Sequence, residues 1–152
     1  MIHQCVRGEL QTDPGCLSPG RTGGDLEIVI PFTGLQTTGA ALERAATLTA
    51  GLNARVLLVA VHTLPYPMQF ACPSAVHAHL VEQMKDLAKL CLLPVYPQVV
   101  LARDREEGFR FALKPSSTVL VATHRHFWRT SEERLARFLA RDGHKVALMH
   151  VN

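Results

Sequence analysis

The chain has 152 residues, of which 47% are hydrophobic and 19% charged, and its formal net charge is +3. This length and composition are typical of one globular domain rather than of a disordered chain. The charge is too small to indicate nucleic-acid binding, and no apolar run reaches the roughly 18–20 residues that span a bilayer. We therefore predict neither nucleic-acid binding nor membrane insertion.

Residues 1–25 are predicted to form a flexible N-terminal tail that precedes a single domain over residues 26–152. The tail is rich in proline and glycine turns and has no sustained apolar periodicity, so it cannot bury enough surface to offset its ordering entropy. It also has no apolar core of a secretory signal. No cysteine pair has metal or redox spacing, which predicts free thiols and a cytoplasmic protein; the cysteines are Cys5, Cys16, Cys72 and Cys91.

Five apolar runs are predicted as strands, at residues 26–33, 55–62, 95–102, 117–123 and 145–151. The second and fourth runs are almost continuously apolar, which is typical of parallel strands buried on both faces. Pro97 lies within the third run and cannot donate a hydrogen bond to a neighbouring strand. We therefore place that strand at an edge of the sheet.

Helical patterns separate these runs. The first helix is predicted to be capped by Thr37 or Thr38 and to bury Ala41, Ala45, Leu48 and Leu52. The second is predicted to be capped by Ser74 and to bury Val76, Leu80, Met84, Leu87 and Cys91. Two capping-box patterns, which start at Asp104 and Thr130, predict the third and fourth helices. Strands that alternate with helices across short connections predict an α/β fold with an open, five-stranded, mainly parallel sheet and helices on both faces.

The sequence Val29-Ile30-Pro31-Phe32-Thr33-Gly34 resembles the first strand and turn of the universal stress proteins. The following Ala-rich helix and the apolar runs at 56–62, 118–123 and 146–149 are similar in spacing to that family. The resemblance implies the adenine-nucleotide α-hydrolase-like fold, a sheet order of 3-2-1-4-5 and frequent homodimers.

The sequence departs from that family where its members bind nucleotides. Thr33 stands where nucleotide-binding members carry Asp, and no glycine lies between Gly108 and Gly143, where they carry a glycine motif. Such glycines let backbone amides approach phosphates. We therefore predict no cofactor, and ATP or AMP binding is disfavoured. Trp128 is expected to be an aromatic plug that fills the vacated phosphate site.

In open α/β sheets, ligands bind beyond the carboxyl ends of the strands, where the strand order reverses. The implied order places this crevice between the first and fourth strands, lined by Thr33, Gly34, Thr123 and His124 with His62 nearby. Three basic residues of the following segment could hold a phosphate or carboxylate; they are Arg125, His126 and Arg129.

The three histidines near this crevice have two possible roles. His62, His124 and His126 could bind a metal ion, although no carboxylate or thiol joins them in the sequence. Otherwise they are ordinary loop histidines, and no metal site is predicted.

No nucleophile elbow, Walker loop or paired-carboxylate motif is present, so we predict that the chain is not an enzyme and has no catalytic residues.

The last strand is apolar, lacks proline and would form the second edge of the sheet. Edges of this kind tend to pair, which predicts a homodimer through Val146, Ala147, Leu148, Met149, His150 and Val151. The loop at residues 63–73 and the basic segment at 125–141 are possible protein-binding surfaces. The predicted function is a non-catalytic module that acts by homodimerisation and protein contacts. The alternatives are a sensor of a nucleotide or other anion in the crevice, and a metal-dependent enzyme.

Overall fold

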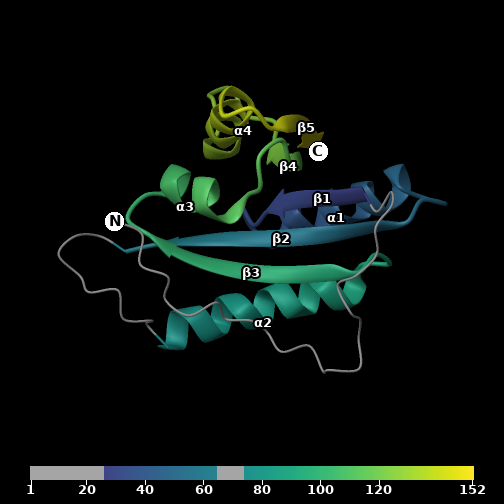
Figure 1. Ribbon diagram of the computed structural model, residues 1–152, viewed down its shortest axis with the longest axis horizontal. Helices are drawn as coiled ribbons and strands as arrows, with labels where there is room; N and C mark the ends of the chain where they lie inside the picture. The colour runs from purple at the N-terminus through teal and green to yellow at the C-terminus, as the bar shows by residue number, and fades with distance from the viewer. Residues whose placement is uncertain (1–25, 65–73) are drawn as a thin grey trace.

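The computed structural model describes residues 26–64 and 74–152. Strands and helices alternate along these residues, and the five strands form one sheet (Figure 1). The strands are β1 (Leu26–Pro31), β2 (Ala54–Thr63), β3 (Val95–Ala102), β4 (Thr118–His124) and β5 (Lys145–Val151). The helices are α1 (Leu35–Leu48), α2 (Ser74–Leu90), α3 (Arg105–Ala112) and α4 (Ser131–Arg141). The predicted tail and the predicted loop at 63–73 lie outside the described residues, apart from Thr63 and Leu64.

The sheet has the order β3-β2-β1-β4-β5, and all four strand pairs are parallel. This arrangement confirms the predicted fold class and strand order. It also confirms that the strand with Pro97 is an edge, because β3 pairs with β2 alone within the described sheet. The opposite edge is β5, as predicted.

Helices cover both faces of the sheet (Figure 1). Alternate residues of β1 face opposite sides, as the strand period requires. Ile28 and Ile30 lie in the core beneath α1 and α2, whereas Val29 lies in the core beneath α3 and α4. The helices α1 and α2 therefore cover one face of the sheet, and α3 and α4 cover the other.

The caps of α3 and α4 confirm the two capping patterns at their amino ends. The Asp104 carboxylate accepts hydrogen bonds from the backbone N–H groups of Glu106 and Glu107, at 2.7 and 3.2 Å. The Thr130 hydroxyl accepts one from the backbone N–H of Glu133, at 3.2 Å. Each cap satisfies helix donors that would otherwise lack partners.

The cap predicted for the first helix is wrong. Gly34 occupies the N-cap position, and Thr37 and Thr38 lie inside α1. Their hydroxyls contact the β1–α1 turn instead: the Thr33 N–H donates to Thr38 Oγ1 at 3.2 Å, and the Thr33 and Thr37 hydroxyls are 2.8 Å apart. The threonines therefore brace the turn before the helix rather than cap it.

The predicted buried faces of the first two helices are partly wrong. In α1, Ala41 and Ala45 are buried, but Leu48 is 57% exposed, and Leu52, beyond the helix end, is 60% exposed. The helix is turned so that Thr38 and Leu42 complete its buried face. In α2, Met84 and Leu87 are buried while Val76, in the first turn, is exposed. The buried stripe of α1 continues from Ala45 to Thr49, which is 2% exposed, so Leu48 lies at its margin.

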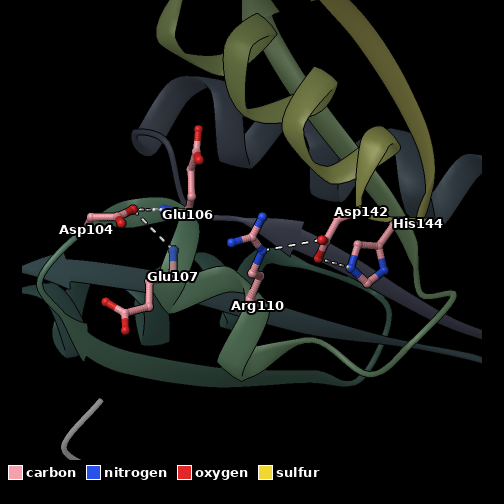
Figure 2. Close-up of polar contacts among 6 residues, drawn as sticks. All are labelled: Asp104, Glu106, Glu107, Arg110, Asp142 and His144. Carbon is pink, nitrogen blue, oxygen red and sulfur yellow. Dashed lines mark hydrogen bonds and ion pairs between the residues drawn. The ribbon is translucent and has the colours of Figure 1, made fainter. Parts of the chain in front are cut away.

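A polar network joins α3 to the turn between α4 and β5 (Figure 2). Arg110 Nε donates to the Asp142 carboxylate at 3.3 Å, and its guanidinium lies 4.8 Å from the centre of the Phe138 ring. His144 is buried, and its Nε2 lies 3.8 Å from the other Asp142 oxygen. These contacts fix the relative positions of the two helices that cover one face of the sheet.

Candidate functional site

The crevice lies where β1 and β4 separate. Their register pairs only Ile28 with Thr118 and Val29 with Val119, although β4 continues to His124. Beyond these pairs, the chain leaves β1 for α1 on one face, and leaves β4 for α4 on the other. This divergence opens a cavity of about 550 Å³ at the carboxyl ends of the strands, where open α/β sheets bind ligands.

The turn after β1 forms one wall of the crevice. The Phe32 N–H donates to the Val59 carbonyl at 2.7 Å, so the strand pairing with β2 holds the start of the turn. Thr33 and Gly34 follow, and the hydroxyls of Thr33 and Thr37 bond to each other. These hydrogen bonds therefore hold the backbone of the β1–α1 turn in place on this side of the cavity.

The opposite wall is formed by the end of β4 and the start of α4. The Thr123 side chain is fully buried, and its hydroxyl lies 2.7 Å from that of Thr130, the residue that caps α4. This contact joins the two ends of the connecting segment. Residues 125–129 between them all lie exposed on the surface.

Thr130 has two structural roles that a substitution would remove together. We expect Thr130→Val to lower the free energy of unfolding by about 1–2 kcal/mol, because it removes the cap of α4 and the hydroxyl contact with Thr123. Thr47→Val, which removes an exposed hydroxyl inside α1, is the matched control and should cost less than about 0.5 kcal/mol. Urea unfolding measures both values, and equal losses would contradict the role of Thr130.

A carboxylate lies in the crevice. Burial alone raises the pKa of Glu132, but hydrogen bonds from its own backbone N–H and from the Ser131 and Thr130 hydroxyls, together with the charge of Arg105, lower it below its usual value. Burial likewise lowers the pKa of Arg105, and Glu132 opposes that shift. Glu132 is therefore ionised at neutral pH, and it adds negative charge to the cavity.

Four of the predicted crevice residues line the cavity, namely Thr33, Gly34, His124 and His126. Thr123 lies behind the wall, and His62, Arg125 and Arg129 are not among the lining residues. The sequence prediction missed the remaining lining residues, which are Phe32, Leu35, Gln36, Thr37, Gln83, Thr130 and Glu132. The capping pattern at Thr130 could have indicated the last two, because it places the amino end of α4 beside the end of β4.

The prediction that Trp128 plugs the phosphate site is wrong. Trp128 is 80% exposed and Phe127 is 97% exposed, and their rings contact each other edge to face at 5.9 Å. The contact between Thr123 and Thr130 closes the ends of the segment, so the residues between them bulge towards solvent. The crevice is consequently open.

The three histidines of the metal hypothesis are not assembled as ligands. The rings of His124 and His126 lie edge to face at 6.4 Å, and His62 is not a lining residue. Within residues 26–64 and 74–152, no group of three or more His, Cys, Asp or Glu side chains is arranged to hold a metal ion.

Ser117, His144 and Asp142 lie in succession but not in the geometry of a catalytic triad. The backbone N–H of Ser117, not its hydroxyl, donates to His144 Nδ1 at 3.2 Å. The Ser117 hydroxyl donates to the Lys114 carbonyl at 2.6 Å. A nucleophilic serine must give its proton to the histidine, so this set is structural.

The solved structures that this chain resembles include two universal stress proteins with TM-scores above 0.5. A universal stress protein crystallised in complex with cAMP aligns with a TM-score of 0.53 and 16% identity, covering 86% of this chain and all of the other. A protein of the universal stress protein family from Burkholderia pseudomallei aligns with a TM-score of 0.54 and 20% identity, covering 81% of this chain and 94% of the other. The chain has the universal stress protein fold.

The likeness to universal stress proteins among known proteins is found by comparison of structures. No protein-family model and no curated protein matches the sequence. None of the described helices is long and apolar enough to cross a membrane. The two solved structures confirm, at the level of the fold, the resemblance in element order that the sequence predicts.

Proposed function

We propose that the chain is a non-catalytic, cytoplasmic module that acts by homodimerisation and protein contacts. The observation that supports dimerisation is the outer edge of β5. Seven residues of β5 pair with β4, from Thr118–Lys145 to His124–Val151, and the other edge of β5 has no partner strand among the described residues. Of its side chains, Lys145, Ala147, Leu148 and His150 are exposed, and Lys145 at one end is the only one with a permanent charge. A long edge with few charges is suited to pairing with a second copy.

The electrostatics of the crevice support the view that this module does not use ATP. The ionised Glu132 carboxylate would repel a polyphosphate. The amino end of α4 would attract a phosphate, but Glu132 lies in its first turn and offsets that attraction. The two candidate arginines, Arg125 and Arg129, lie outside the cavity lining. Contacts with other proteins are assigned instead to the basic segment at 125–141, where Phe127 and Trp128 are exposed, and to the loop at 63–73.

We expect Leu148→Lys to shift the dimer towards monomer. Leu148 is 40% exposed, so the monomer tolerates the change, whereas pairing of two β5 edges brings the new charges close together. Light scattering after size-exclusion chromatography, over a range of concentrations, measures the mass. Tyr96→Lys is the control, since it puts the same charge on the opposite edge strand at 38% exposure. A monomeric parent at every concentration would refute dimerisation.

A second candidate function is a small-ligand sensor. It is favoured by the open crevice of about 550 Å³, which Trp128 does not fill, and it fits the cAMP complex of the structural neighbour. A ligand with a single phosphate places less negative charge near Glu132 than ATP does. Under this alternative, the neutral lining residues and the two histidines would contact the ligand.

Thermal unfolding in the presence of cAMP, AMP, ATP and inorganic phosphate separates the two functions. The preferred function predicts no shift of Tm, because a ligand stabilises the native state only if it binds it. The sensor function predicts a shift of several degrees, and a larger shift in Glu132→Gln, which removes the negative charge. Glu133→Gln, on the same helix but outside the cavity lining, is the matched control.

A further inference from the structure

A second cavity lies between α1 and α2, on the face of the sheet remote from α3 and α4. It measures about 590 Å³, and we call it the α1/α2 groove. Its lining residues are Gly39, Leu42, Glu43, Ala46, Thr47, Ala50, Leu87, Leu90, Cys91 and Leu92. Leu90 is 83% exposed and Leu92 is 94% exposed. Single exposed leucines are common, but a continuous apolar groove is typical of a binding surface.

Leu26, the first residue of β1, lies beside one end of this groove. The Leu26 N–H donates to the Asn53 carbonyl at 3.0 Å, and a tight turn after α1 links Asn53 to Ala50 in the groove wall. Leu52, in that turn, is 60% exposed. The Leu26 side chain packs against the same core as α1 and α2. Leu26, to which residues 1–25 are attached, therefore lies on the groove side of the sheet, near the end of the groove that Ala50 forms.

The first residues of the chain have the composition that the groove requires. Apolar side chains recur at Ile2, Val6 and Leu10, and the charged residues among them are Arg7 and Glu9. Glu43 is the only charged side chain that lines the groove among residues 26–64 and 74–152. With the apolar residues in the groove, Arg7 could pair with Glu43, and Glu9, near the end of the segment, could remain in solvent.

We propose that residues 2–10 bind in the α1/α2 groove of their own chain. The intervening residues are long enough, because even the stretch from Cys16 to Leu26 can span roughly 30 Å when extended. A tethered segment also has an effective concentration of about millimolar, so modest affinity is sufficient. This proposal does not depend on the function proposed above, since the groove is separate from both the crevice and β5.

The native cysteine of the groove provides the test. Cys91 is partly buried and lines the groove. In full-length protein carrying Cys5→Ser, Cys16→Ser and Cys72→Ser, Cys91 is the only thiol, and its rate of alkylation by iodoacetamide reports access to the groove. We expect Val6→Asp to increase this rate several-fold, because a buried carboxylate opposes binding of the segment. Gln4→Asp, which places the same charge two residues earlier in the segment, should change it much less.

Disulfide trapping gives an independent measurement in protein that carries only Cys72→Ser. Mild oxidation with diamide should form an intramolecular disulfide from Cys91 to Cys5 or Cys16, identified by mass spectrometry of the digested protein. Equal alkylation rates in Val6→Asp and its parent would overturn the proposal. Protection of Cys91 that disappears on dilution would also overturn it, because the occupant would then be a second copy of the chain.

Discussion

Phe109→Ala is expected to lower the free energy of unfolding by about 3–5 kcal/mol, which is the usual cost of emptying a buried phenylalanine site. Phe109 is 1% exposed and is the largest fully buried side chain of the described residues. It anchors α3 in the core that this helix shares with α4. The loss is a large fraction of the stability of an ordinary domain, and Tm should fall by roughly 10 °C or more.

Phe111 provides the control for this substitution. It lies in the same short helix but is 46% exposed, so Phe111→Ala should cost less than about 1 kcal/mol. Both variants change helix propensity equally, and the difference between them measures burial alone. Urea unfolding monitored by circular dichroism gives both values. Similar losses for the two variants would show that Phe109 does not hold α3 on the sheet.

Gly108→Ala is expected to destabilise the protein by about 1–3 kcal/mol, although alanine is the better helix former. A Cβ added at Gly108 would lie 2.5 Å from Val61 Cγ1 and 3.2 Å from the Ala102 Cβ. Helix propensity would favour alanine by about 1 kcal/mol, but overpacking against β2 and β3 costs more. Val61 is β-branched and has few alternative rotamers, so it cannot move aside easily.

Two further variants decide whether this clash is the cause. In Gly39→Ala, the added Cβ would meet only Leu87 Cδ2 at 3.7 Å, an ordinary contact. That variant should gain up to about 1 kcal/mol from helix propensity. In the double variant with Val61→Ala, the penalty of Gly108→Ala should largely disappear, so the two changes are strongly non-additive. Additive effects would mean that α3 does not approach β2 as closely as described.

The sequence predicts the sheet well because strands and caps leave local signals. Pro97 identifies an edge strand since its ring removes a backbone donor, whatever the rest of the fold. Asp104 and Thr130 identify helix starts because a side-chain oxygen must accept the free N–H groups there. The bounds of β3 and β5 are the same in the sequence prediction and in the structure.

The errors arise where distant contacts override local preference. Thr37 and Thr38 have good capping side chains, but their hydroxyls bond to the β1–α1 turn, and Gly34 becomes the cap. Leu48 is apolar, but the buried stripe of α1 passes through the adjacent Thr49, which is 2% exposed, and leaves Leu48 at its margin. The rotation of a helix on the sheet depends on packing that a local apolar pattern does not show.

The position of the candidate site could be predicted from the sequence, but its charge and several of its lining residues could not. Strand order alone locates the crevice at the ends of β1 and β4. Its charge depends on Glu132, whose pKa is lowered by hydroxyl groups and by Arg105 from another helix. The exposure of Trp128 likewise depends on the contact of Thr123 with Thr130 across the base of its segment. Apolar character predicted a buried tryptophan, whereas the closed base of the segment directs it outward.

The two edges of the sheet differ in one further respect. Pro97 interrupts the hydrogen-bonding groups of β3, whereas β5 contains neither proline nor glycine. If two chains pair through β5, the exposed edges of the enlarged sheet are both β3, and each carries the proline. Growth by strand addition therefore stops after one step. A single imino acid at the far edge limits an association that would otherwise be open to fibre formation.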